Sequence, residues 1–409
     1  MTSDPSLTER IAAHVLRPVE AITRDRARLH LLDWLACVGA ARRGSVALAL
    51  AGDGSALAHA AWLGNVLEMD DVHRASILHP GPVVWPAALA GPARPISAML
   101  HAAVRGYEAM IAVGATLDAR HYAHYHNTAT AGVFGAAAAS FVDGDAATLA
   151  SAFGLAGSVN GGLWQMRHAP GDAKQWHVAH AVETGARAAH YARLGMRGPR
   201  HILEGPQGLY AATCATPKPL VLTNSWQIEA VSFKPWGACR HAHPSIDAAL
   251  ELKAEGLLDG AVTVESYADA LTFCDRPDPA SVLDAKFSLQ HAVAIVIERG
   301  VPQLADFEPA AIKELASTRA RVTVCEAAEF TARFPAHFGA RVSTAHGSVT
   351  LIDTRGDPER PLSRDGVISK ARALLAWGEV DAAGIDACLA AALDAQDTQP
   401  VLDWLAAWL

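Results

Sequence analysis

Three histidines stand immediately before segments that look like helix starts: His79 before Pro80, His126 before Asn127, and His243 before Pro244-Ser245. A helix N-terminus offers free N–H groups and positive potential, so it attracts carboxylates and favours the neutral imidazole. A general base needs that neutral form near pH 7. If the three starts converge, they form an anion pocket that can move protons. The alternative is that each histidine only packs against or caps its helix.

Three acidic residues and a further histidine lie just before the first of these predicted helix starts. Glu68, Asp70, Asp71 and His73 precede His79 within twelve residues. Such a cluster can bind a metal or transfer protons, and its apolar neighbours argue against a solvated loop. Metal ligation is an alternative, but neither an HExxH motif nor a 2-His-1-carboxylate spacing is evident, so no metal is expected. We expect Glu68 and Asp71 to orient groups or relay protons.

Lysine is rare in this chain, so its positions are informative. Only seven of the 34 Lys and Arg residues are lysine, beside 19 histidines. Lys174 and Lys234 both lie next to tryptophan, at Trp176 and Trp236, which makes plain surface exposure unexpected although it remains the alternative. Lysine and arginine can hold several carboxylates. The neighbouring candidates for substrate binding are His177, Arg240, His241 and His243.

Composition excludes several classes of protein. The chain has 409 residues, 51% hydrophobic and 19% charged, which is typical of a folded protein. Its net charge of −8 gives no basic footprint for nucleic acid. Six scattered cysteines without a CxxC motif indicate a reduced, cytoplasmic protein, and a thiol nucleophile at Cys239 is a minor alternative. The polar, acidic start MTSDPSLTER predicts no signal peptide.

Known cofactor and membrane signals are also absent from the sequence. Asn160-Gly161-Gly162 lacks the GxGxxG pattern of a dinucleotide site, and no P-loop or GxSxG elbow occurs, so no cofactor is expected. The most apolar run, 129–142, is shorter than the roughly 20 residues that a membrane span needs. It predicts a buried, alanine-rich helix instead.

The elements that must position these residues are mostly helices in the first two hundred residues. Ser6 and Glu9 have the spacing of a capping box, and Asp145 is expected to cap a helix that ends near Gly157. Further helices are predicted at 23–40, at 86–100 with an interruption at Gly91-Pro92, and at 178–194.

The pattern changes near residue 225. Strands are predicted at 230–234, 261–267 and 320–325, and a hairpin at 340–344 and 347–353 turning around His346-Gly347. Helices at 246–255 and 287–298 lie between them, and helical periodicity returns after the charged link 357–364. The prediction is a mainly α fold: a large all-helical domain (1–227 plus 363–409) with a smaller inserted α+β lid domain (228–362).

Four segments together resemble the MmgE/PrpD family: 68–71 with 78–84, 126–139, 233–247 and 286–294. They are similar to the family blocks D-F-D-D-T…HPG-x-V, HPTATxGxFGAAAAA, KPYPxCRxxHPxIDA and KFSLPYAVA. The resemblance implies a large helical domain with an α+β lid, a homodimer, and an active site between the domains. It places His79 at the acid–base histidine and His126, Lys174 and Lys234 at other active-site positions. Glu68, Val72 and His291 depart from the family's usual Asp, Thr and Tyr.

The resemblance implies a cofactor-independent enzyme that acts on a small di- or tricarboxylate by moving a proton α to a carboxylate. A hydro-lyase of the 2-methylcitrate dehydratase type is the first choice. An isomerase or epimerase, or a decarboxylase, acting on a related polycarboxylate such as iminodisuccinate or cis-aconitate comes next. The alternative from another class is a non-catalytic carboxylate- or metal-binding homologue. His291 is expected, with the other candidates, to face the substrate.

Overall fold

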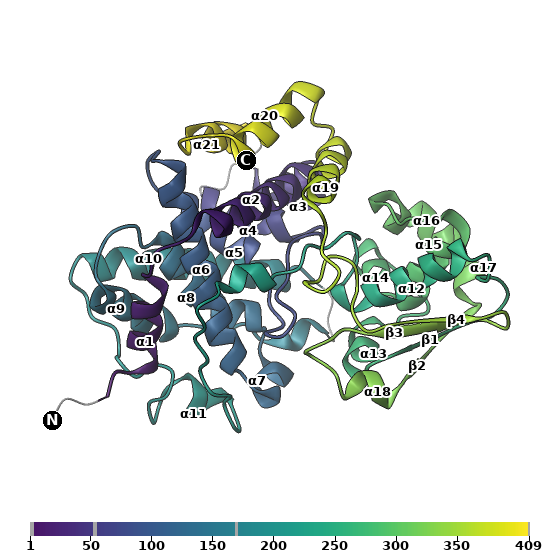
Figure 1. Ribbon diagram of the computed structural model, residues 1–409, viewed down its shortest axis with the longest axis horizontal. Coiled ribbons are helices and arrows are strands. Elements are labelled where there is room, and N and C mark those ends of the chain that lie inside the picture. Colours follow the sequence, from purple (N-terminus) through teal and green to yellow (C-terminus); the bar gives the residue numbers. More distant parts are fainter. Residues whose placement is uncertain (1–3, 52–54, 168–170, 408–409) are drawn as a thin grey trace. The chain divides into compact units, whose positions relative to one another are not determined.

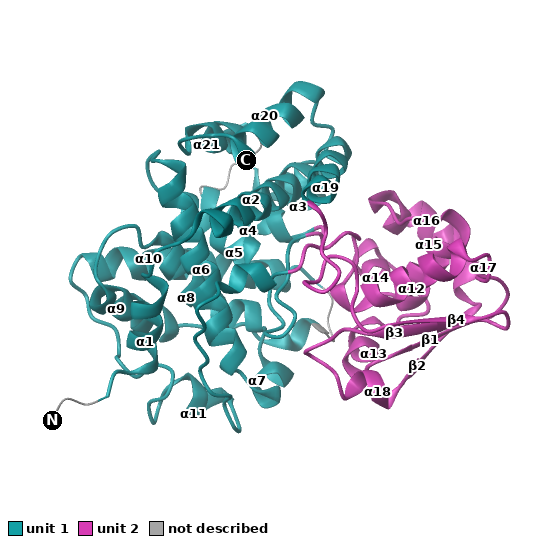
Figure 2. Cartoon of the chain, in the orientation of Figure 1, with its two compact units in different colours: residues 1–66, 70–231, 364–409 teal, residues 67–69, 232–363 magenta. Residues whose placement is uncertain are grey.

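The computed structural model describes residues 4–51, 55–167 and 171–407, and its fold is mainly α with one small sheet. The predicted fold class is therefore confirmed. The chain forms two compact units: residues 1–66, 70–231 and 364–409 make the first, and 67–69 with 232–363 make the second (Figure 2).

The first unit is a helical assembly whose buried centre is α8 (Asn127–Ser140), packed against α5, α6, α9 and α10. Every residue of α8 from Asn127 to Ala139 is buried, as predicted for this alanine-rich run. Small side chains let the neighbouring helices approach closely; a Cβ at Gly106 of α6 would lie 2.8 Å from Ala139 Cβ. The other α-helices of this unit (Figure 1) are α1 (Leu7–Val15), α2 (Ala21–Ala41), α3 (Ser45–Leu50), α4 (Ala56–Asn65), α5 (Gly81–Leu89), α6 (Ile96–Thr116), α7 (Ala119–His124), α9 (Ala146–Gly157), α10 (Ala173–Arg193), α11 (Leu209–Thr213), α19 (Arg364–Trp377), α20 (Ala382–Leu393) and α21 (Gln399–Ala406).

Local capping signals place several helix ends as predicted. Ser6 and Glu9 form a reciprocal capping box at α1, and the Asp145 carboxylate accepts the Thr148 N–H at 2.8 Å at the start of α9. The Gly91-Pro92 interruption separates α5 from α6. These ends follow from contacts between residues three apart, which a sequence displays directly.

The second unit contains a four-stranded sheet in the order β2-β1-β3-β4. β1 (Val262–Ser266) is parallel to β2 (Val322–Glu326) and antiparallel to β3 (Ala340–Ser343), which forms the predicted hairpin with β4 (Ser348–Leu351). Helix α12 (His243–Ala254) packs on β3 and β4, and α15 (Leu289–Arg299) on β2 and α12. The remaining helices here (Figure 1) are α13 (Ala268–Cys274), α14 (Val282–Lys286), α16 (Pro309–Glu314), α17 (Ala316–Arg319) and α18 (Ala328–Thr331).

The predicted strand at 230–234 is wrong. Gln227–Ala230 forms a short 3₁₀ helix, and the extended residues after it join no strand of the sheet. Phe233 donates its N–H to Gly356 O at 3.2 Å, which is one contact with a loop and not a ladder. Val231 and Phe233 are fully buried, but so are Ser232 and Lys234, so neither face of this segment is exposed. The alternation of apolar and polar residues therefore does not mark a half-buried strand here, and sheet pairing needs a partner strand as well.

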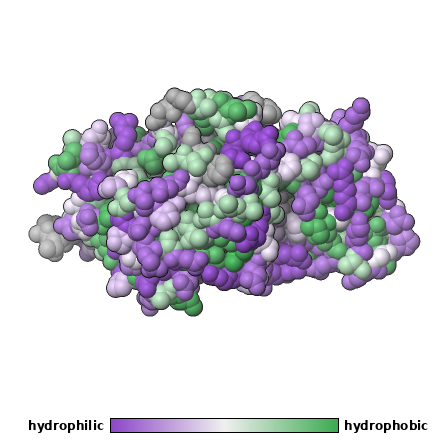
Figure 3. Space-filling model, turned by 90° about the horizontal axis from the view of Figure 1, so that it is seen from above, coloured by the Kyte–Doolittle hydropathy of each residue, from purple (hydrophilic) through white to green (hydrophobic). Residues whose placement is uncertain are grey.

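The surface mixes residue types on the face drawn in Figure 3, where hydrophilic and hydrophobic residues are interspersed. Among the residues that the structure describes, none of the helices has both the length and the apolar character required to cross a membrane.

Substitution of Gly356 tests the close packing of its loop against Phe233. Its φ is +95°, and a Cβ at this position would lie 1.9 Å from Phe233 O. We predict that Gly356→Ala lowers the free energy of unfolding by about 3 kcal/mol or more, because the clash adds to the cost of the left-handed backbone. The matched control is Gly260→Ala, which also has positive φ (+73°) but has no atom within 4 Å of the new Cβ. It should cost only about 1 kcal/mol. Equal losses in urea denaturation would contradict the steric argument.

Candidate active site

His79 and Asp70 form a histidine–carboxylate pair at the start of α5. His79 Nδ1 lies 2.8 Å from Asp70 Oδ2; the Asp70 side chain is buried, and that of His79 is 15% exposed. An ionised carboxylate only accepts hydrogen bonds, so Nδ1 carries the hydrogen and Nε2 of the neutral ring keeps its lone pair. The pair therefore has the arrangement of an oriented general base.

Backbone and amide contacts hold this pair in place. Asn65 Nδ2 donates to Asp70 Oδ2 at 2.9 Å, and the His79 N–H donates to Thr128 Oγ1 at 3.1 Å. Between the two partners the chain turns back on itself, with His73 and Leu78 exchanging backbone hydrogen bonds of 2.9 and 3.3 Å. Because Thr128 lies in the first turn of α8, the starts of α5 and α8 lie next to each other, as the convergence hypothesis requires of these two helices.

Asp71 has a different set of partners from Asp70. Its carboxylate accepts hydrogen bonds from His30 Nδ1 (2.7 Å), Tyr107 Oη (2.5 Å) and the Gly81 N–H (2.7 Å). Burial raises the pKa of Asp71 to about 6, against the lowering effect of the Tyr107 and Gly81 hydrogen bonds. Burial also holds the pKa of His30 well below its usual value, so this ring is the neutral donor.

Four of these side chains were missed by the sequence reasoning as site residues: Asn65, Asp70, His30 and Tyr107. Asp70 stood in the acidic segment, but no local pattern distinguishes it from Asp71. His30 and Tyr107 lie in the middle of long helices, at 0% exposure, among apolar neighbours. In sequence they are indistinguishable from core residues, because their partner is more than 35 residues away.

His126 and His177 are brought together in the first unit. His126 is the N-cap of α8, donates its N–H to Gly162 O at 2.8 Å, and has its ring 4.5 Å from that of Trp164. The His177 ring lies 5.7 Å from the His126 ring, and burial lowers its pKa. The His79 N–H donates to Thr128 in the first turn of α8, and His126 is the N-cap of the same helix. His79 and His126 therefore both lie beside the start of α8.

Lys174 occupies the second position of α10, one turn before His177 on the same helix face, and is partly exposed. Trp176 was expected to make plain exposure of Lys174 less likely; Lys174 is only partly exposed, although Trp176 itself is 57% exposed. Successive residues of a helix point in different directions, so Trp176 does not shield its neighbour two positions away.

In the second unit, Glu68 and Lys234 form a buried ion pair with Nζ and Oε2 3.5 Å apart. Glu68 has a φ of +56°, an uncommon value for a residue other than glycine. Lys286 Nζ donates to Leu67 O at 2.7 Å and so secures this short segment. Trp236 is buried, as expected from the sequence, and its indole N–H donates to Asp247 at 3.0 Å.

Arg240 and His243 are engaged inside the second unit. Arg240 donates to the Asp357 carboxylate and to His243 Nδ1 at 3.2 Å, and His243 Nε2 lies 3.1 Å from Ala238 O. His243 is the first residue of α12 and not the residue before it, and its side chain is completely buried. A role for these two side chains in binding substrate stays a prediction.

His241 and His291 occupy two separate buried sites of the second unit. The His241 ring stacks between Phe273 and Phe338, at centroid distances of 5.1 and 5.3 Å, and its Nδ1 lies 2.6 Å from Tyr267 Oη. His291 is completely buried, and its Nε2 lies 2.8 Å from Asp306 O. Burial lowers the pKa of His291 to about 4, so the ring is neutral and Nε2 carries its hydrogen.

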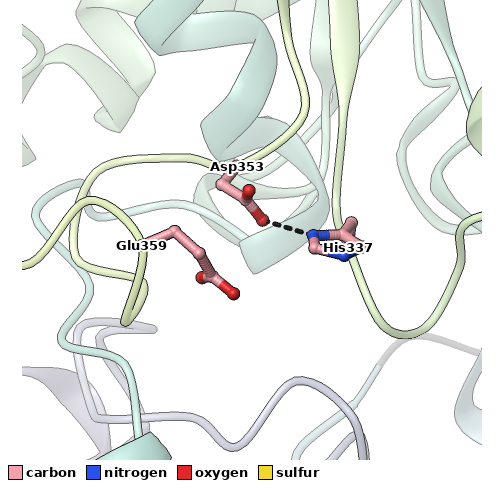
Figure 4. Close-up of side chains that lie close together, drawn as sticks. All are labelled: His337, Asp353 and Glu359. Carbon is pink, nitrogen blue, oxygen red and sulfur yellow. Dashed lines mark hydrogen bonds and ion pairs between the residues drawn. The ribbon is translucent and has the colours of Figure 1, made fainter.

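One further cluster could hold a metal ion: His337, Asp353 and Glu359, whose ligand atoms lie within 4.8 Å of one another (Figure 4). His337 Nδ1 lies 2.7 Å from Asp353 Oδ1, which is a hydrogen-bond distance. Two ligand atoms about 2.1 Å from one tetrahedral ion lie about 3.4 Å apart. As they stand, His337 and Asp353 are a hydrogen-bonded pair with an exposed glutamate nearby, and no metal is assigned to them.

The buried neutral His291 predicts a specific pH dependence. Its pKa is near 4 in the folded protein and 6.5 in the unfolded chain, so the unfolded chain binds a proton first as the pH falls. Folding stability is therefore lost between about pH 6.5 and 4. His291→Gln, whose amide can still donate to Asp306 O, should reduce that loss by up to about 3 kcal/mol. Urea titrations at several pH values measure it, with the exposed His346→Gln as control. An unchanged pH slope in His291→Gln contradicts the argument.

Comparison with known proteins shows the family of this chain. The model of the MmgE/PrpD N-terminal domain matches residues 52–221, and that of the MmgE/PrpD C-terminal domain matches residues 236–391. A cis-aconitate decarboxylase from Homo sapiens is 26% identical over 192 residues, which cover 43% of this chain and 40% of that protein. The chain thus aligns with less than half of this relative. The two domain models, in contrast, follow each other in order and span most of the sequence, so the chain belongs to the MmgE/PrpD family.

Proposed function

We propose that this protein is an enzyme that moves a proton at the carbon α to a carboxylate of a small di- or tricarboxylate, without a cofactor. The proposal rests on the environment of His79. Its imidazole is partly exposed, and its Nδ1 is hydrogen-bonded to the buried Asp70 carboxylate at 2.8 Å. His79 lies within the region matched by the N-terminal family model. Its Nε2 is the base, and in the return step the acid.

The chemistry requires more than a base, because a proton α to a carboxylate is only weakly acidic. As Nε2 takes the proton, negative charge develops on the carboxylate oxygens and must be stabilised by cations or hydrogen-bond donors. Lys174 and Lys234 are proposed for this task. The Asp70 carboxylate stabilises the imidazolium that forms when His79 is protonated, since its charge is 2.8 Å away.

Three reactions of such substrates use a proton transfer at this carbon. In dehydration the C–H electrons form a C=C bond, and the β-hydroxyl leaves as water after protonation. In epimerisation the proton returns to the opposite face of the carbon. In decarboxylation the C–CO₂ bond breaks, CO₂ leaves, and the acid protonates the carbon. We propose dehydration of the 2-methylcitrate type as the reaction of this protein. Decarboxylation is the second candidate, favoured by the similarity to a cis-aconitate decarboxylase.

The proposal predicts a large effect of His79→Gln on turnover. Wild-type protein incubated in D₂O with citrate, 2-methylcitrate, cis-aconitate or iminodisuccinate should convert or deuterate at least one of them, as read by proton NMR. His79→Gln should lower that rate by about 10²–10⁴-fold, the usual contribution of a general base.

His14→Gln is the matched control for this experiment. His14 also pairs with a buried carboxylate, Glu108, at 3.0 Å, and its side chain is 16% exposed. It should retain the wild-type rate within about twofold, a change below 0.5 kcal/mol in the barrier. If His79→Gln turns over as fast as His14→Gln, the base is misassigned. Tight binding of a polycarboxylate without proton exchange would favour a non-catalytic binding protein, and activity lost on removing a stoichiometric metal would contradict the cofactor-free reaction.

A further inference from the structure

Asp71 is a completely buried carboxylate at the meeting point of three helices in the first unit. It accepts hydrogen bonds from His30 of α2, Tyr107 of α6 and the Gly81 N–H at the start of α5. Tyr107 Oη in turn accepts the indole N–H of Trp85, also in α5, at 3.1 Å. A buried carboxylate is stable only while its donors stay in place, so this arrangement constrains how α5 begins.

The contact with Gly81 leaves no space for a Cβ unless the Asp71 carboxylate moves. A Cβ at position 81 would lie 2.6 Å from Asp71 Oδ1. Gly81 is only two residues after His79, and Pro80 between them has little conformational freedom. The direction from which the chain leaves His79 is therefore set by the Asp71–Gly81 hydrogen bond.

The neighbouring carboxylates Asp70 and Asp71 thus have separate tasks. Asp70 Oδ2 contacts the His79 imidazole, whereas the three hydrogen-bond donors of Asp71 are protein groups other than His79. We propose that Asp71, with its donors His30 and Tyr107, is a positioning residue that holds the first turn of α5 and thereby keeps the His79 ring on Asp70. This inference rests on the proposed role of His79 as base.

The protonation states near pH 7.5 agree with this role. Burial raises the pKa of Asp71 only to about 6, so the carboxyl is ionised and accepts. Burial, followed by the nearby Arg26 and Lys370, keeps the pKa of His30 well below its usual value. Burial raises the pKa of Tyr107 well above 10, so the phenol keeps its hydrogen and donates.

Tyr107→Phe tests the inference, with Tyr210→Phe as its matched control. Both tyrosines are buried in the first unit and each donates one hydroxyl hydrogen bond, but Tyr210 Oη donates to Thr116 Oγ1 at 2.7 Å and not to a carboxylate. A merely structural loss would lower the melting temperature without lowering kcat, and it would be larger in Tyr107→Phe, which also removes the acceptor of the Trp85 indole N–H. A positioning role predicts that Tyr107→Phe alone lowers kcat, by about tenfold or 1.4 kcal/mol, with KM changed less than about twofold.

A second measurement does not depend on knowing the substrate. The hydrogen on His79 Nδ1, held between ring and carboxylate, should give a low-field proton NMR signal that is assigned by its loss in His79→Gln. Tyr107→Phe should weaken or shift this signal, and Gly81→Ala, which displaces the Asp71 carboxylate, should do the same. Tyr210→Phe should leave it unchanged.

The outcomes separate the two proposals. If no candidate substrate reacts, the proposed function fails, and the NMR signal still decides whether Asp71 positions His79. The positioning role is overturned if folded Tyr107→Phe and Gly81→Ala both keep the wild-type His79 signal, or if turnover is measured and Tyr107→Phe matches Tyr210→Phe in kcat. A shifted signal in both variants, with the control unchanged, supports it.

Discussion

Two adjacent carboxylates, Asp70 and Asp71, are buried inside the helical unit, and the arrangement of its helices depends on satisfying them. An ionised carboxylate removed from water is costly unless donors surround it, and each carboxylate has its own set. Helices α2, α5 and α6 supply donors to Asp71, while Asn65 at the end of α4 binds Asp70. A shift of any of these helices would leave a buried charge without one of its hydrogen-bond donors. The polar contacts therefore restrict the helix packing more than apolar contacts alone would.

Another buried acid of the same unit connects α2 to the C-terminal part of the chain. Asp33 of α2 lies 2.6 Å from Lys370 Nζ of α19, and both side chains are nearly inaccessible. Burial raises the pKa of Asp33 to about 6, with Asp70 and Asp71 adding to the rise and Lys370 opposing it. The C-terminal helix α19 thus supplies a positive charge to a region rich in carboxylates. This ion pair is one of the contacts that join α19 to α2.

The second unit satisfies its buried carboxylates with both cationic and neutral hydrogen-bond donors. Asp357 accepts from Arg240 and from Ser232 Oγ, and Asp247 accepts from Trp236, Thr354 and the Arg355 N–H. Glu68 is paired with Lys234 within this unit, although it stands only two residues before Asp70 of the other. The acidic segment that begins at Glu68 therefore contributes its first acid to one unit and its next two acids to the other.

Much of the fold could be predicted because its signals are local. The capping box at Ser6, the cap at Asp145, the break at Gly91-Pro92 and the hairpin at His346-Gly347 all depend on residues a few positions apart. Residue type and spacing also pointed to His79 and His126, whose neighbouring residues resemble helix starts. The strand predicted at 230–234 was wrong because alternation of apolar and polar residues does not by itself provide a partner strand.

The sequence by itself determined the mainly α character, most helix ends and a short inventory of titratable residues. Only the tertiary structure decided which of those residues meet. In the folded protein His79 contacts Asp70, whereas His30 and Tyr107 donate hydrogen bonds to Asp71, although the two acids are neighbours with the same chemistry. The reason is that a buried carboxylate is defined by the donors around it, and most of these donors come from helices distant in sequence. No local pattern records that long-range choice, because it arises only when the helices pack.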